Sequence, residues 1–163
     1  MPLFGQNHRF TIDKWAFLIR YQVIAGQLDD AAETLRQARE LDGGLSAENS
    51  LEVAASRLAS ARGDFETAER EARIELDRTR KIGGLPSVEM ADSLHALALA
   101  QFGRGQLPLA VTSLREAISI MRPEINQGTP MLAEMQSNLA KILRAIRPDD
   151  AKADSLEKTL KQN

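Results

Sequence analysis

Apolar residues recur through most of the chain at the three- and four-residue spacing that places side chains on one face of an α-helix. Ile12, Trp15 and Ile19 follow this pattern early in the chain, and Leu94 and Leu97 continue it later. Nowhere do β-branched residues alternate as they do in a half-buried strand. The pattern therefore predicts an all-α chain. Seven or eight helices are expected, at about residues 10–24, 28–41, 46–62, 64–81, 87–103, 107–122, 130–146 and 149–161.

Three short segments resemble one another and mark the places where paired helices turn. Residues 26–31, 63–68 and 105–110 each read glycine, polar, large apolar, two variable residues and alanine, and their glycines lie 37 and 42 residues apart. Glycine can end a helix with positive φ at little steric cost, and alanine lets two helices cross closely. The segments predict one domain, residues 1–163, of stacked helix pairs. The pairs are expected at about residues 10–43, 46–84, 87–128 and 130–161.

Composition and charge narrow the possible partners. The 163 residues carry a formal net charge of −2 and include no cysteine. A near-neutral chain has no general attraction to nucleic acid or anionic lipid, and without cysteine it forms no disulfide or thiolate metal site. No apolar run is long enough to span a bilayer, and the N-terminus lacks the features of a signal peptide. We therefore expect a cytoplasmic protein that binds neither nucleic acid nor membrane.

The three segments and the positions around them resemble the tetratricopeptide repeat (TPR) family. The matching positions are Trp15, Gly26, Leu28, Ala31 and Ala38 in the first repeat, Gly63, Phe65 and Ala68 in the second, Leu97, Ala98, Gly105, Leu107, Ala110 and Ala117 in the third, and Leu139 and Ala140 in the fourth. The resemblance implies a right-handed α–α superhelix (solenoid) of about 3.5–4 helix–turn–helix repeats. It also implies a scaffold for protein–protein interaction.

The sequence departs from the TPR motif at a few positions. Glu75 stands where the second repeat should carry its later alanine, and Ile19 and Ser56 replace a small residue. The longer spacing is similar to that of the kinesin-light-chain subtype, which has about one extra helical turn. Residues 4–11 resemble the linker that joins repeats in that subtype. We therefore expect a helix before residue 1. Either the chain begins in the middle of the array of repeats or it is part of a larger protein, and we favour the second alternative.

Candidate catalytic and metal-binding residues are few. Glu89, Asp92 and His95 follow one another at a spacing that makes a poor chelate. Ser93 and His95 are two residues apart and do not face each other on a helix, so no serine nucleophile is indicated. The sequence predicts no catalytic residue, no metal and no cofactor, and the chain is expected not to be an enzyme.

Superposing the first helices of the four repeats predicts a strip of side chains on the concave face, where stacked repeats bind extended ligands. The strip consists of Arg20, Arg57, Leu99 and Lys141 at equivalent positions, His95 one turn earlier, and Phe102 and Arg144 about one turn later. Its positive charges favour a protein or peptide partner, in particular an acidic one. A solvated face that binds nothing is the other interpretation of these charges. The alternative function is a ligand- or peptide-sensing regulatory module attached to a kinase or transcription-regulator domain.

The helix expected at residues 10–24 is apolar around much of its circumference. Phe17, Leu18 and Ile24 accompany the residues that should form its buried face. A terminal repeat normally carries a polar outer surface. We therefore expect this helix to meet either a second copy of the chain or a missing domain.

Overall fold

The computed structural model describes residues 4–42, 51–83, 86–124 and 129–146, which are helical apart from short turns. The helices are α1 (Phe4–Ile24), α2 (Leu28–Asp42), α3 (Leu51–Ala61), α4 (Phe65–Gly83), α5 (Val88–Gly103), α6 (Leu107–Glu124) and α7 (Pro130–Ile146). No strand occurs in these ranges, so the predicted all-α class is confirmed. The helix expected at 149–161, and the residues 46–50 expected to begin the third helix, lie outside the described residues.

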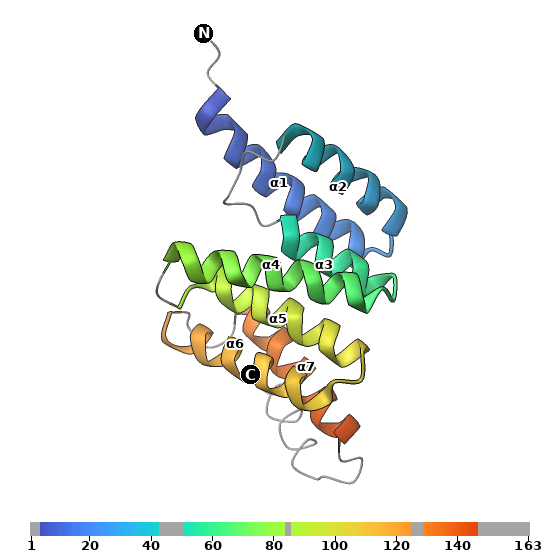
Figure 1. Ribbon diagram of the computed structural model, residues 1–163, viewed down its shortest axis with the longest axis vertical. Coiled ribbons are helices and arrows are strands. Elements are labelled where there is room, and N and C mark those ends of the chain that lie inside the picture. Colours follow the sequence, from blue (N-terminus) through green and yellow to red (C-terminus); the bar gives the residue numbers. More distant parts are fainter. Residues whose placement is uncertain (1–3, 43–50, 84–85, 125–128, 147–163) are drawn as a thin grey trace.

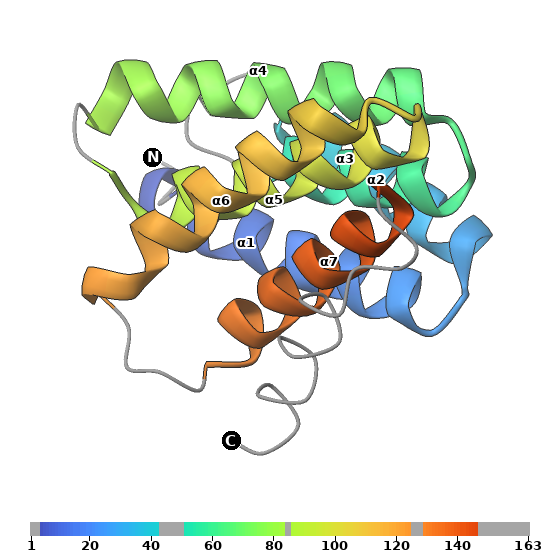
Figure 2. The ribbon, with the colours of Figure 1, turned by 90° about the horizontal axis from the view of Figure 1, so that it is seen from below.

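Successive helices pack as pairs that are stacked along the long axis of the molecule (Figure 1). Helices α1, α3, α5 and α7 pack against one another in series. The backbones of α2, α4 and α6 pack only against odd-numbered helices, and these three helices reach one another through long side chains, as Arg39 of α2 does with Glu71 of α4. In Figure 2, α4 lies on one side of the stack, and α1 and α7 lie on the other. The odd-numbered helices therefore form one continuous face, as expected for the first helices of stacked repeats.

The three predicted glycine turns are present and share one geometry. Gly26, Gly63 and Gly105 have φ angles of 75°, 79° and 73°. In each turn the residue after glycine donates its N–H to a carbonyl oxygen five residues earlier, and for Asp64 and Ala59 this distance is 2.9 Å. This bond is part of the Schellman motif, which satisfies carbonyl groups at the end of a helix. The turns thus end the first helix of each pair and reverse the chain within three residues.

The alanines of the repeated segments lie at the crossings of the paired helices, as predicted. Ala31, Ala68 and Ala110 are each 0% exposed. Their backbone N–H groups already belong to the first turn of the second helix, since each donates to the residue four positions earlier. A larger side chain at these positions would have to push the two helices of a pair apart.

The beginning of α1 differs from the prediction. The helix begins at Phe4 and not near residue 10, so the segment that resembles a linker, residues 4–11, is helical. This segment contains Gly5 but no proline. A single glycine lowers helix stability by only about 1 kcal/mol, which is too little to end a helix that is otherwise continuous.

Helix α4 buries three glutamates, each of which is paired with arginine. Glu69 pairs with Arg73 and Arg104, Glu71 with Arg39 and Arg70, and Glu75 with Arg78. The side chain of Glu75 is only 2% exposed. Glu75 is the residue that departs from the alanine of the repeat motif, and the structure accommodates it by placing the Arg78 guanidinium on its carboxylate. Both oxygens of Glu75 accept from Arg78, one of them from Nε at 2.8 Å.

Candidate functional site

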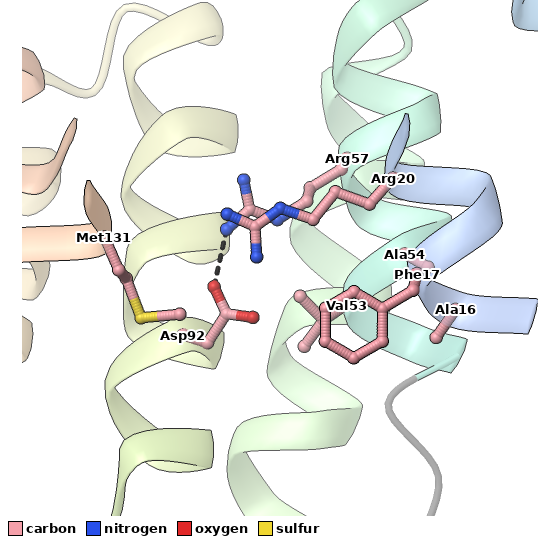
Figure 3. A pocket seen from close by; sticks show the side chains of 8 residues that line it. All are labelled: Ala16, Phe17, Arg20, Val53, Ala54, Arg57, Asp92 and Met131. Carbon is pink, nitrogen blue, oxygen red and sulfur yellow. Dashed lines mark hydrogen bonds and ion pairs between the residues drawn. The ribbon is translucent and has the colours of Figure 1, made fainter. Parts of the chain in front are cut away.

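A pocket of about 160 Å³ opens on the face formed by the odd-numbered helices (Figure 3). All four of these helices contribute to it. It is lined by Ala16, Phe17 and Arg20 of α1, Val53, Ala54 and Arg57 of α3, Asp92 of α5 and Met131 of α7. Because stacking brings together residues that are far apart in sequence, this pocket exists only in the assembled array.

One wall of the pocket is apolar. Ala16, Val53 and Ala54 are almost fully buried and belong to the packing between the helices. Phe17, by contrast, is 72% exposed, although its ring lines the pocket together with Val53 (Figure 3). An aromatic ring that is largely open to solvent beside a recess is a natural contact for an apolar side chain of a partner.

The other wall of the pocket is charged and internally paired. Arg57 Nη2 donates to Asp92 Oδ1 at 2.5 Å, and the two side chains are only 10% and 20% exposed. Glu134 of α7 approaches two arginines, at 3.7 Å from Arg57 Nη1 and 3.6 Å from Arg20 Nη2. The Arg20–Glu134 pair links the first described helix to the last one, across the face that α3 and α5 occupy between them. The charges therefore balance, two cations against two carboxylates.

His95 of α5 belongs to the same charged cluster but lies beneath the surface. It is 0% exposed, and its Nε2 is 2.9 Å from Asn138 Nδ2. If the Asn138 amide donates, the neutral ring carries its proton on Nδ1. Burial lowers the pKa of His95 to about 4, assisted by the positive charge of Arg57. His95 is therefore neutral at physiological pH and supports the pocket from behind.

The structure brings together only part of the predicted strip. Arg20 and Arg57 line the pocket, and His95 is close to it but buried, so the expectation that His95 faces the groove is wrong. The four remaining residues do not line the pocket. Leu99 and Arg144 are half-buried, Phe102 is 37% exposed, and Lys141 is exposed.

The expectation that the strip is positively charged is also wrong for its part on α1 and α3. Arg20 and Arg57 face Asp92 and Glu134, so that part of the strip has no excess positive charge. Exposed positive charge remains at Lys141 on α7.

Sequence reasoning missed four residues at this site: Phe17, Asp92, Met131 and Glu134. A signal for the two acids was present. Asp92 and Glu134 lie 42 residues apart, the same separation as Leu99 and Lys141, so they occupy equivalent positions of successive repeats, two turns before the predicted strip. Acidic residues at equivalent positions of successive repeats, close to arginines that are also at equivalent positions, indicate ion pairs across the face.

Two other features concern the described part of the chain. There, no three histidine, aspartate or glutamate side chains gather as a group that could hold a metal ion. None of the described helices has the length and apolar character needed to cross a membrane.

Comparisons with known proteins find similarity in structure and not in sequence. No curated protein and no protein-family model matches the sequence. Crystal structures match at the level of the fold, and two of them illustrate the similarity. One contains nearly identical TPR-like repeats of a protein described as a kinesin light chain of Podosopora anserina, and it superposes with a TM-score of 0.71 at 22% identity over 92% of this chain and 73% of that one. The other is a variant of the same repeats, with a TM-score of 0.71 at 21% identity over 94% and 74% of the two chains. This chain therefore has the fold of TPR-like helical repeats.

Proposed function

We propose that this chain is a protein–protein interaction module that holds a segment of a partner protein against the face of its odd-numbered helices. One observation carries the proposal: the pocket of about 160 Å³ is lined by residues of α1, α3, α5 and α7 together. A recess that every stacked unit helps to build can recognise a segment that runs along the stack. The TPR-like fold is in keeping with this role.

The pocket suits an anchoring side chain of the partner. Cavities of about 150 Å³ with apolar walls accept groups as large as benzene, so a pocket of about 160 Å³ has room for a leucine, methionine or phenylalanine side chain. Phe17 would cover the anchor from the side. The remainder of the segment would pass over Leu99, Phe102, Lys141 and Arg144, and exposed Lys141 favours acidic residues there.

Selection from a library of random peptides tests the proposal. Segments that bind the wild-type protein should bind the Phe17→Ser variant at least tenfold more weakly, because the variant removes the aromatic edge of the pocket; each tenfold loss corresponds to about 1.4 kcal/mol. Since Phe17 is 72% exposed, the melting temperature should change little. Isothermal titration calorimetry of the selected peptides would measure the loss.

A matched control uses an exposed apolar residue on the opposite side of the stack. Leu109 of α6 is 51% exposed, and Leu109→Ser should leave the affinity unchanged. Equal weakening by both substitutions, or a library that yields no binder, would contradict the proposal.

A second interaction is favoured by the outer side of α1. Leu18, Tyr21 and Ile24 are 46%, 70% and 77% exposed, and together we name them the N-terminal patch. Spacings of three residues place Leu18, Tyr21 and Ile24 along one side of the helix. Tyr21 and Ile24 also follow Phe17 by four and seven residues, so the patch adjoins the edge of the pocket. We propose that two copies of the chain associate through this patch, because a contiguous apolar surface is unfavourable in water.

Sedimentation velocity at increasing protein concentration tests this self-association. The wild-type protein should form a dimer at high concentration, and Ile24→Asp should stay monomeric, because a charge at the centre of the interface would lose its hydration. Leu109→Asp, the same kind of change on α6, should still dimerise. A wild-type protein that stays monomeric throughout would rule out the second copy and leave another domain as the partner of the patch.

A further inference from the structure

The two arginines of the pocket are incompletely paired. Arg57 is nine-tenths buried, and a guanidinium group carries five N–H donors. Its Nη2 donates to Asp92, but its Nε has no acceptor among the described residues. Buried donors of this kind are normally satisfied, so the Arg57 guanidinium has hydrogen-bonding capacity that the described residues do not use. Because Nε is shielded from solvent, a further acceptor would have to approach the Nη atoms, near which Glu134 lies.

Glu134 partly fills that role from within the chain. Its carboxylate lies 3.6 Å from Arg20 and 3.7 Å from Arg57. These distances are those of ion pairs, but they are too long for hydrogen bonds. The side chains of Arg20 and Glu134 are 28% and 41% exposed, and partly exposed ion pairs without hydrogen bonds contribute little to stability. Arg57 is only 10% exposed, but it keeps its hydrogen bond to Asp92 when Glu134 leaves. Glu134 can therefore leave the two arginines with little loss of stability.

We propose that Arg20 and Arg57 form a receptor for a carboxylate of the bound segment, and that Glu134 competes with this carboxylate in the free protein. This inference rests on the proposed function. The charge balance requires competition, because a ligand carboxylate that entered beside both Asp92 and Glu134 would place three negative charges against two positive ones. When Glu134 moves away, the ligand carboxylate restores the balance and can accept hydrogen bonds from the guanidinium groups.

The position of the receptor defines the class of ligand. Arg20 and Arg57 share the pocket with the apolar wall of Ala16, Phe17 and Val53. The ligand should therefore combine a carboxylate with an adjacent apolar side chain of leucine size, as an acidic peptide segment does. Phe17 would contact the apolar side chain while the arginines bind the acid.

A blocked dipeptide, N-acetyl-Leu-Glu-amide, is a suitable probe, with ¹H–¹⁵N NMR titration as the measurement. It should shift amide signals around Phe17, Arg57 and Met131. The neutral analogue N-acetyl-Leu-Gln-amide and the small analogue N-acetyl-Ala-Glu-amide should bind more weakly. In the Glu134→Gln variant, which removes the competing charge and keeps the shape, affinity for the acidic probe should rise by about three- to fivefold.

A matched variant separates this effect from a change in overall charge. Glu116 of α6 is 45% exposed and pairs with Arg80 at 3.4 Å, and Glu116→Gln should leave the affinity for the probe unchanged. Three results would overturn the inference: no shift of the pocket residues by the acidic probe, equal binding of the neutral analogue, or a Glu134→Gln affinity that is unchanged or lower. If library peptides still bound the face with Phe17-dependent affinity in any of these cases, the proposed function would stand without the carboxylate receptor.

Discussion

Replacement of Arg78 by methionine should lower the free energy of unfolding by about 3 kcal/mol at neutral pH. The Glu75 carboxylate is 2% exposed, and Arg78 donates to both of its oxygens. Removal of the cation leaves a buried negative charge without its partner, and this loss exceeds what the pair itself contributes. Methionine preserves much of the apolar stem of arginine, so lost packing is a small part of the effect.

The stability that Arg78→Met loses should increase with pH. Burial raises the pKa of Glu75, the nearby acids Glu52 and Asp92 raise it too, and Arg78 lowers it. Without Arg78 the pKa of the folded state rises further, so the folded state binds a proton more tightly than the unfolded chain. Stability then falls as pH increases through the folded-state pKa. Urea unfolding followed by circular dichroism should therefore show a larger deficit for Arg78→Met at pH 7 than at pH 5.

Two comparisons identify the stranded charge as the cause. The double variant Glu75→Met/Arg78→Met should recover most of the lost stability, since an apolar pair of similar volume often replaces a buried ion pair without loss. Arg73→Met should lose less than about 1 kcal/mol, because Arg73 is 54% exposed and its partner Glu69 keeps Arg104. A double variant as unstable as Arg78→Met alone would show that packing, and not charge, explains the loss.

The fold was predictable because its determinants are local. A positive-φ glycine and an alanine five residues later fix each turn and crossing, as Gly63 and Ala68 illustrate. The true start of α1 is hard to predict because residues 4–11 include glycine, asparagine, histidine and threonine, which favour a helix only weakly. Glu75 was recognised as a departure, but its partner Arg78 could be identified only once the depth of burial was known.

The site was less predictable because it depends on how the stack curves. The alignment of the repeats predicted that Arg20 and Arg57 lie on the same face, and in the structure both residues line the same pocket. Arg20 can reach Glu134 only if the small rotations between successive helix pairs add up to the right curvature from α1 to α7. No local sequence pattern indicates this sum of rotations. The burial of His95 likewise depends on α7, since Asn138 lies against its ring.

His95 should make the protein less stable in mild acid. The pKa of its ring is about 4 in the folded state, against an ordinary value of 6.5. Between these values the unfolded chain binds a proton that the folded protein does not, so stability rises with pH across this window and is lost as pH falls through it. A difference of this size corresponds to about 3 kcal/mol at about 1.4 kcal/mol per pKa unit.

The groups around the ring explain why it stays neutral. Burial has the largest effect, and the positive charges of Arg57 and Arg20 add to it, while Glu134 and Asp92 oppose it. Protonation would also make both ring nitrogens donors, and Nδ1 has no hydrogen-bond partner among the described residues. The folded protein therefore has no favourable place for the second proton.

Unfolding of wild type and His95→Gln over a series of pH values isolates this contribution. Other acids titrate in the same window, and Glu75 and Glu52 act in the opposite direction because their pKa values are raised. These groups remain in both proteins, so the difference between the two stability curves reports on His95. That difference should shift steadily in favour of the variant as the pH falls from 6.5 toward 4, and an NMR titration of the wild-type ring should have its midpoint near pH 4. Parallel stability curves, or a ring that titrates near pH 6.5, would mean that His95 is solvated in solution and that the cluster behind the pocket is open.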